Sequence, residues 1–247
     1  MTHEIFSAPL ETLRKKWSEI PAGNLERMTT SDMLNLSDAQ LHQLWKEKYD
    51  ESTGDDQFSV RGWYHTLYRE FLSSRKIMDV GSGFGIDGIS FAKSGAQVTF
   101  VDIVESNLEI LQRICHHLNL SNVHFNYISD FSDFDQLPLD FEVIWAQGSM
   151  INAPFEVMQQ EVAKILEHLP PGGRWIELAY PRERWLREGS LPFNEWGKKT
   201  DGETTPWMEY YDLERLLKRL SPARFNPILN LNFHNDDFNW FDLLRVS

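Results

Sequence analysis

Acidic residues and glycines lie together in one short stretch of the sequence, IMDVGSGFG. Asp79 ends an apolar segment, and three alternating glycines follow it: Gly81, Gly83 and Gly85. A second apolar segment, VTFVD, ends in Asp102. Glycines in such a loop let the backbone turn tightly and approach a ligand, and the helix after the loop offers its N-terminal amides. The stretch therefore predicts a nucleotide-binding unit.

These positions also restrict which nucleotide is bound. A dinucleotide-binding loop has the spacing GxGxxG, but Ile86 stands where the third glycine would be. The carboxylate of Asp79 would repel a pyrophosphate, whereas it suits a ligand with a positively charged amino group. Asp102 lies where such folds carry a carboxylate that accepts hydrogen bonds from ribose hydroxyls. An amino acid joined to adenosine satisfies both acids. S-adenosylmethionine is such a molecule, and a nicotinamide-dependent reductase is disfavoured.

Apolar patterns elsewhere predict strands that alternate with helices. We expect strands at 76–80, 96–102, 123–128, 141–147 and 174–181, and helices at 85–93, 106–118, 154–169 and 212–220. A capping box of Ser106 and Glu109 is expected to begin the second of these helices. Two final apolar stretches, 225–233 and 238–246, are separated by HNDD and predict a hairpin. The pattern predicts an α/β fold: a doubly wound, mostly parallel seven-stranded sheet with a terminal antiparallel hairpin.

The first part of the chain predicts helices that precede this sheet. LSDAQLHQLWKEKY has apolar residues at helical spacing, with Ser37 as N-cap before Gln40. An aromatic amphipathic helix is expected over 60–72, directly before the first strand. The expected domains are a helical N-terminal cap over 1–60 and a nucleotide-binding domain over 61–247, with a cap insertion of irregular structure at 182–206.

DVGSGFG together with VTFVDI resembles the class I S-adenosylmethionine-dependent methyltransferases, and the likeness extends over about residues 60–247. This Rossmann-like family has a sheet with an antiparallel last strand, and the resemblance implies S-adenosylmethionine as the cofactor. It also implies a set of cofactor contacts. These are Asp79, Gly81, Ser82, Gly83 and Gly85 at the methionine end, Asp102 at the ribose, Ile103, Asp130 and Phe131 at the adenine, and Gln147 beside the methyl donor.

The end of the fourth strand, WAQGSMIN, restricts the chemistry further. Relatives that act on amide or nucleobase nitrogens commonly carry Asn/Asp-Pro-Pro-aromatic at this position. Metal-dependent catechol-type relatives place an aspartate there to bind magnesium. Trp145, Ala146 and Gln147 supply neither pattern, and no His/Cys cluster has zinc spacing. We therefore expect no metal in the site.

Methyl transfer from a sulfonium needs mainly the alignment of nucleophile, methyl group and sulfur, so proximity and orientation can supply much of the acceleration. A base can assist when the acceptor is a hydroxyl. The candidate catalytic residues are Tyr64 and His65 before the glycine loop, Gln147 on the fourth strand, and Glu177 and Tyr180 on the fifth.

Aromatic residues near the insertion are the main indication of the acceptor. Trp185, Trp196 and Trp207 predict a mobile aromatic cap that closes over a small molecule, with packing or a dimer interface as the alternative. Three arginines are candidates to offer positive charge to an acidic group on that molecule: Arg61, Arg182 and Arg184.

Composition limits the class of partner. The net charge of −13 opposes nucleic acid, whose binding rests on phosphate neutralisation by Lys and Arg. A single cysteine, Cys115, excludes an intrachain disulfide, and no apolar stretch is long enough to span a bilayer. We expect a cytoplasmic enzyme that methylates an O or N atom of a small polar metabolite, a sugar being one candidate. A non-catalytic cofactor-binding partner subunit, a nucleic-acid methyltransferase and an oligomeric state are left open.

Overall fold

The structure is a computed structural model that describes residues 4–20, 28–54 and 59–247. The chain forms two compact units. Trp17–Ile128 form the glycine-loop unit, whereas Met1–Lys16 and Ser129–Ser247 form the carboxyl-terminal unit. The domain boundary expected between residues 60 and 61 stays a prediction, and these units divide the chain at other points.

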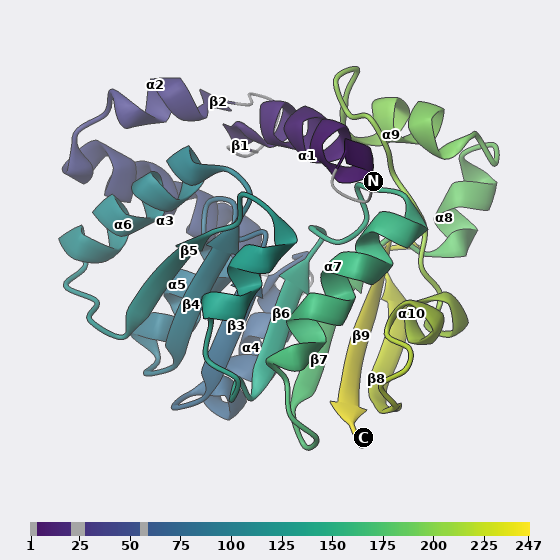
Figure 1. The fold of residues 1–247 in the computed structure, drawn as a ribbon. Helices are drawn as coiled ribbons and strands as arrows, with labels where there is room; N and C mark the ends of the chain where they lie inside the picture. The colour runs from purple at the N-terminus through teal and green to yellow at the C-terminus, as the bar shows by residue number, and fades with distance from the viewer. Residues whose placement is uncertain (1–3, 21–27, 55–58) are drawn as a thin grey trace. The chain divides into compact units, whose positions relative to one another are not determined.

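Seven strands make up the sheet: β3 Lys76–Val80, β4 Gln97–Asp102, β5 Val123–Tyr127, β6 Val143–Gln147, β7 Arg174–Ala179, β8 Phe225–Phe233 and β9 Phe238–Arg245. Their order is β5-β4-β3-β6-β7-β9-β8 (Figure 1). In the glycine-loop unit β3, β4 and β5 pair in parallel. In the carboxyl-terminal unit β6 and β7 are parallel, while β9 is antiparallel to both β7 and β8. The predicted doubly wound fold with its terminal hairpin is confirmed.

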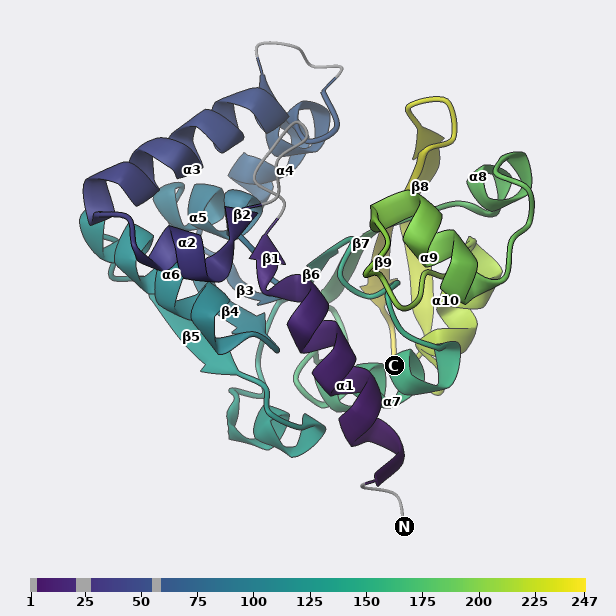
Figure 2. The same ribbon diagram turned by 90° about the horizontal axis from the view of Figure 1, so that it is seen from above.

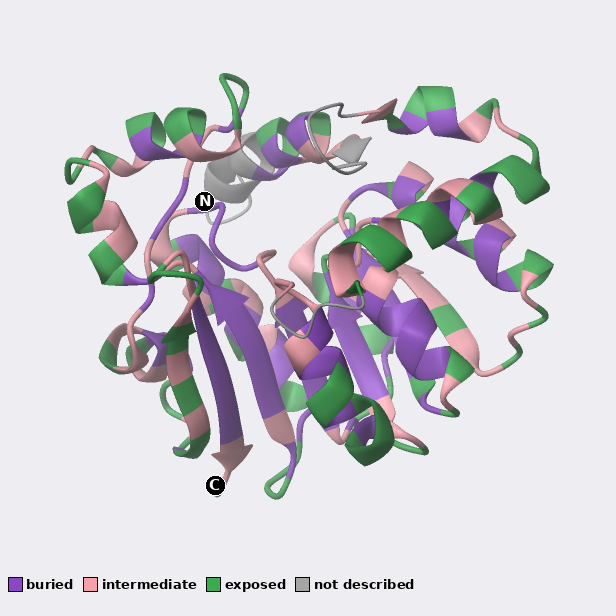
Figure 3. Cartoon of the chain, turned by 180° about the vertical axis from the view of Figure 1, so that it is seen from behind, coloured by how far each residue is buried: buried purple, intermediate pink, exposed green. Residues whose placement is uncertain are grey.

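Burial follows from this topology. Strands β3, β4, β6, β7 and β9 bury most of their residues, whereas the edge strand β8 is largely exposed (Figure 3). Strands in the middle of a parallel sheet are covered on both faces, so they consist of nearly continuous apolar residues. This explains why the strands could be located from the sequence to within two residues at either end.

In the glycine-loop unit the helices are α2 Thr30–Leu34, α3 Asp38–Thr53, α4 Gly62–Leu72, α5 Ile86–Lys93 and α6 Glu105–His117, with the short strands β1 Glu19–Ile20 and β2 Met28–Thr29. Helix α3 contacts both α5 and α6 (Figure 2). Ser37 and Gln40 form the expected capping box at the start of α3.

The capping box expected at Ser106 and Glu109 is wrong. Helix α6 begins at Glu105, with Val104 as an N-cap that makes no side-chain bond. The physical reason lies at the end of β4, where the Asp102 carboxylate accepts a hydrogen bond from the Val104 N–H at 2.8 Å. A carboxylate outside the helix thus satisfies an amide at its start, and a capping serine is not needed.

In the carboxyl-terminal unit the helices are α1 Glu4–Trp17, the 3₁₀ helix η1 Phe131–Gln136, α7 Phe155–Glu167, α8 Arg182–Arg187, α9 Phe193–Asp201 and α10 Leu213–Arg219. The irregular structure expected for 182–206 is wrong, because α8 and α9 occupy most of it. Pro181 and Pro192 are the N-caps of these two helices. A proline just before a helix needs no N–H partner and sets the chain direction there, so short helices form despite the polar composition.

Gly88 in α5 permits close packing of this helix on the sheet. A Cβ at this position would lie 2.5 Å from Asp79 Oδ2 and would also overlap the Phe100 ring. Both contacts come from strands, β3 and β4. Gly88 therefore permits the close helix–strand packing that the third glycine of a dinucleotide-binding loop permits. It lies two positions later in the chain than that glycine would.

We expect Gly88→Ala to destabilise the protein by about 1–3 kcal/mol, since overpacking at a helix–strand contact outweighs the higher helix propensity of alanine. Gly88→Ser should cost more than Gly88→Ala. Urea denaturation measures the free energy of unfolding. A gain of about 1 kcal/mol for Gly88→Ala, as for a solvent-facing helical glycine, would contradict the packing argument.

Candidate active site

The loop after β3 has a backbone conformation that favours glycine. Gly81, Gly83 and Gly85 have φ angles of +67°, +51° and +65°. A Cβ at Gly83 would meet nothing nearer than the Gly81 carbonyl oxygen at 4.0 Å, so the space in front of this residue is open. The Ser82 hydroxyl donates to the Asp79 carbonyl at 2.8 Å and accepts from the Val101 N–H at 3.2 Å. Ser82 thus fixes the loop to both β3 and β4.

Asp102 is held at the end of β4 by several donors. Its Oδ2 accepts from the Gly83 N–H at 3.1 Å and from Asn107 Nδ2 at 3.3 Å, and its Oδ1 accepts from Val104. Burial raises the pKa of Asp102 to about 6, although these hydrogen bonds oppose the shift. The carboxylate is therefore largely ionised at neutral pH and has one orientation. Sequence reasoning missed Asn107, which lies on α6 and has no motif of its own.

Asp79 is a buried carboxyl group at the end of β3, with 5% of the residue exposed. The Gly88 N–H donates to it. Burial and the neighbouring charge of Asp87 raise the pKa of Asp79 well above its usual value, and the positive charge of Arg61 only partly offsets this. Ionisation of Asp79 is therefore unfavourable in the ligand-free protein, and an ammonium group at this position would offset that cost.

A buried network joins α4 to the first turn of α5. The Arg61 guanidinium forms an ion pair with Asp87, and His65 Nε2 lies 2.6 Å from Asp87 Oδ1. The Tyr64 hydroxyl donates to Asp87 at 3.2 Å and accepts from Arg61 at 2.8 Å. Burial raises the pKa of Asp87, but Arg61 and His65 outweigh that effect and hold it below its usual range. Asp87 was missed in the sequence, where it is one acid among many.

This network defines the surroundings of two predicted catalytic residues. Tyr64 is fully buried, and burial raises the pKa of its hydroxyl well above the usual value. His65 is 5% exposed and stacks on Phe91 with ring centroids 5.6 Å apart. Both side chains bond to Asp87, an arrangement that holds this acid and Arg61 in place.

Asp130 and Phe131 lie at the start of η1 in the carboxyl-terminal unit. Asp130 is the N-cap, and its Oδ1 accepts from the Ser132 N–H at 2.7 Å. Asp133 completes a capping box with Asp130. The Asp133 carboxylate accepts from the Asp130 N–H at 3.1 Å, so the two acids have different partners. Asp130 and Phe131 are both half-buried.

Gln147 ends β6 with its side-chain amide unpaired. Among the residues that the structure describes, neither Nε2 nor Oε1 has a hydrogen-bond partner, although both atoms are buried. Gly148 follows with φ +70° and donates its N–H to the Leu178 carbonyl at 3.0 Å. Buried polar atoms are almost always paired, so this amide is suited to a ligand or a water molecule.

Glu177 and Tyr180 have different surroundings from those expected of catalytic bases. Glu177 is fully buried and forms an ion pair with Arg219. The aromatic ring of Tyr180 lies under the Arg184 guanidinium, whose Cζ is 4.1 Å from the ring centroid. Burial raises the pKa of Tyr180, and Asp201 adds to the shift. The Glu177 expectation is wrong because its carboxylate is engaged in the core.

Comparison with known proteins identifies the class to which this arrangement belongs. The family model described as a methyltransferase domain matches residues 77–173, from β3 to the turn before β7. Residues 77–173 are thus similar to a methyltransferase domain. The predicted resemblance to class I S-adenosylmethionine-dependent methyltransferases is confirmed over these residues.

Individual relatives agree with this assignment. A mitochondrial ubiquinone biosynthesis O-methyltransferase of Schizosaccharomyces pombe is 29% identical over 108 residues, which are 44% of this chain and 39% of that protein. The ribosomal RNA small subunit methyltransferase G of Idiomarina loihiensis is 24% identical over 178 residues, 64% of this chain and 81% of that protein. The chain thus spans less than half the length of the ubiquinone relative.

A solved structure shows the same fold. The N-methyltransferase NodS of Bradyrhizobium japonicum, in complex with S-adenosylhomocysteine, superposes with a TM-score of 0.55 at 13% identity. The match covers 82% of this chain and 98% of NodS.

The tryptophans of residues 182–207 pack within the carboxyl-terminal unit. Trp196 is fully buried and donates Nε1–H to Glu188 at 2.6 Å. Trp185 donates to the Leu191 carbonyl at 2.8 Å, and Trp207 donates to Glu209 at 2.9 Å. Trp196 is therefore a core residue, and closure of this region over an acceptor stays a prediction.

The three predicted arginines differ in their partners. Arg61 pairs with Asp87 and Arg184 with Glu188, whereas Arg182 is exposed. Within 4–20, 28–54 and 59–247, no cluster of three or more His, Cys, Asp or Glu side chains could hold a metal ion. The helices in those same ranges include none with the length and apolar character needed to cross a membrane.

We expect Asp79→Asn to stabilise the ligand-free methyltransferase and to weaken its binding of S-adenosylhomocysteine at least tenfold. The pKa of Asp79 is higher in the folded than in the unfolded chain, so ionisation of Asp79 removes stability as pH rises. The gain in melting temperature should therefore be larger at pH 8 than at pH 5.

Thermal denaturation and calorimetry measure the two effects. Asp135→Asn, at an exposed acid paired with Lys164, is the control and should change neither. Equal or lower stability of Asp79→Asn at pH 8, with unchanged affinity, would show that Asp79 is not the ammonium partner.

Proposed function

We propose that this methyltransferase transfers a methyl group from S-adenosylmethionine to an oxygen or nitrogen of a small polar metabolite, without a metal. The observation that carries the proposal is the pair of buried carboxylates at the ends of β3 and β4. Asp79 lacks a full positive counter-charge, and Asp102 is fixed in one orientation beside the open glycine loop. An aminoacyl nucleoside supplies both the charge and the hydroxyl donors that these acids accept.

Charge complementarity assigns the methionine end of the cofactor. Asp79 accepts from its ammonium group, and the backbone of Gly81, Gly83 and Gly85 leaves room for the chain. The Arg61 guanidinium bonds to Asp87 and Tyr64 through NH1, and its side chain is 29% exposed. In our proposal its remaining donors bind the cofactor carboxylate, because Arg presents several N–H groups in a fixed plane.

The nucleoside end is assigned from the strand ends. Asp102 accepts from the ribose hydroxyls, and Ile103 next to it contacts the adenine. Asp130 and Phe131 are proposed for the adenine edge, which agrees with their half-buried position at the start of η1. Gln147 is proposed beside the methyl donor on the basis of its unpaired amide.

When bound, S-adenosylmethionine supplies an activated methyl group, so the protein needs mainly to orient the acceptor. We assign Tyr64 and His65 a positioning role through Asp87, since both side chains bond to that acid. Tyr180 remains a proposed contact for the acceptor. A general base is not required for an amine acceptor that is already neutral.

An RNA acceptor is the alternative raised by the ribosomal RNA relative. The net charge of −13 disfavours it, because phosphate binding needs clustered Lys and Arg. The ubiquinone O-methyltransferase relative supports a small molecule instead. A cytoplasmic location and an acceptor of sugar type are part of the proposal and rest on the sequence alone.

The proposed function predicts that labelled methyl groups pass to small molecules rather than to RNA. Labelled S-adenosylmethionine is incubated with the chain and either a deproteinised cell extract or purified ribosomal RNA from the same cells. Label in the small-molecule fraction is the expected result. Label in RNA alone would establish the alternative, and label in neither fraction would favour a cofactor-binding subunit.

Asp102→Ala should weaken S-adenosylhomocysteine binding by about 1.5–3 kcal/mol, the contribution of a charge-assisted hydrogen bond. NAD should not compete in the same calorimetric titration. Asp135→Ala serves as the control at an exposed acid. Unchanged affinity in Asp102→Ala would remove the ribose assignment.

Metal removal should leave methyl transfer unchanged. The expected rate after dialysis against EDTA equals the untreated rate, since alignment of the reactants supplies the acceleration in our proposal. A loss of activity that magnesium restores, with unchanged melting temperature, would contradict the metal-free mechanism.

A further inference from the structure

A buried ion pair in the carboxyl-terminal unit has no part in the proposed cofactor contacts. Glu177 on β7 and Arg219 on α10 are both 0% exposed. Trp175 donates Nε1–H to Glu177 Oε2 at 2.8 Å. Removing two charges from water is unfavourable, and such pairs are often no more stable than apolar residues of similar size. Stabilisation of the fold is therefore not a sufficient reason for the Glu177–Arg219 ion pair.

Arg219 also bonds to the loop that follows Gln147, which is one of the proposed site residues. Its NH1 donates to the Met150 carbonyl at 2.7 Å. Met150 belongs to 148–154, the loop that follows β6 and begins directly after Gln147. The Glu209 N–H donates to the next carbonyl, that of Ile151, at 2.8 Å. The loop thus accepts hydrogen bonds from α10 and from the segment that precedes α10.

Residual unpaired atoms show that this pair is not optimised for stability. Glu177 Oε1 and Arg219 Nε are buried without a hydrogen-bond partner among the described residues. Glu161 on α7 also interacts with Arg219, and burial raises the pKa of Glu161 to about 7. One guanidinium thus interacts with a buried acid, Glu177, and with the half-buried Glu161 while it donates to a backbone carbonyl.

We propose that Arg219, oriented by Glu177, is a positioning residue that holds loop 148–154 and the Gln147 amide for the methyl acceptor. The inference rests on the proposed function. An amide offers donors and an acceptor side by side. The matching group on the acceptor is uncharged and both donates and accepts, and a hydroxyl has this property.

The test replaces both charges at once. Arg219→Met/Glu177→Leu removes the hold on Met150 without leaving an uncompensated charge on Glu177, so a folded protein is expected. S-adenosylhomocysteine affinity should stay within about twofold, because the residues proposed for the methionine, ribose and adenine ends of the cofactor are unchanged. Methyl transfer to a deproteinised cell extract should fall at least tenfold, and hydrogen exchange in 148–154 should become faster.

Arg174→Met/Asp242→Leu is the matched control. This pair joins the start of β7 to β9 in the same unit, with Arg174 Nε 2.6 Å from Asp242 Oδ1. The two side chains bond to each other, and we expect transfer to be retained when both are replaced. If the first double variant does not fold, Arg219→Lys keeps a positive charge beside Glu177 with fewer donors. It should then show faster exchange in 148–154 and need a higher extract concentration for half-maximal rate.

Unchanged transfer and unchanged exchange in the Arg219 variants would overturn the proposal. So would a parallel loss of transfer and of S-adenosylhomocysteine binding, because that result assigns the pair to the fold as a whole. If the unmodified chain labels no small molecule, the proposed function fails instead. The exchange of 148–154 still decides whether Arg219 holds the loop.

Discussion

Three buried carboxylates lie in the glycine-loop unit, where the Arg61 guanidinium pairs with one of them, and the chemistry of the site depends on this imbalance. Asp79, Asp87 and Asp102 are each at most 5% exposed. Arg61 pairs with Asp87, whereas burial raises the pKa values of the other two acids. Charges that the fold leaves uncompensated lower its stability, and a ligand that supplies the missing positive charge and donors restores that loss. In our proposal that ligand is a cationic amino acid joined to a ribose.

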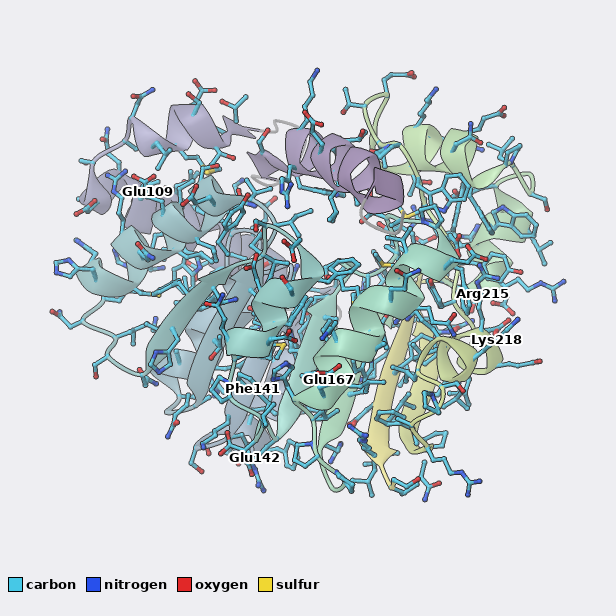
Figure 4. The ribbon with its side chains drawn as sticks, in the orientation of Figure 1. Glu109, Phe141, Glu142, Glu167, Arg215 and Lys218 are labelled. Carbon is cyan, nitrogen blue, oxygen red and sulfur yellow. The ribbon has the colours of Figure 1, made fainter. Side chains whose placement is uncertain are left out.

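In the carboxyl-terminal unit, Arg215 and Lys218 have partners within the same unit. Arg215 pairs with Glu209 and lies over the Phe155 ring, with Cζ 4.9 Å from the centroid. Lys218, labelled beside it on α10 in Figure 4, approaches the same ring at 5.6 Å. Such cations are compensated by acids and aromatic faces of the same unit. Charges here hold helices together, and the neutral amide of Gln147 is one of the buried polar groups left without a partner among the described residues.

Local sequence patterns were sufficient for the strands and for the glycine loop. Continuous apolar runs mark buried strands, and an acid at the end of such a run lies at the ligand-binding edge, as for Asp79 and Asp102. The same reasoning could not find Asp87, Gly88 or Asn107. Their roles depend on how α5 and α6 lie against β3 and β4, which no local spacing records. A glycine within a helix next to the loop, as in GFGIDG, is the one available signal.

Residue type alone does not show the surroundings that decide the chemistry of a group. Glu177 has a carboxylate near the end of a strand, yet its ion pair with Arg219 occupies that group. Tyr64 and His65 have suitable acids and bases, but both are bound to Asp87. A methyl transfer needs mainly the alignment of its reactants. Titratable side chains can then serve to hold in place the groups that contact the ligand. We therefore expect acceptor selectivity to depend on the unpaired Gln147 amide at the end of β6. The most reactive side chains, which are bonded to other protein groups, should matter less.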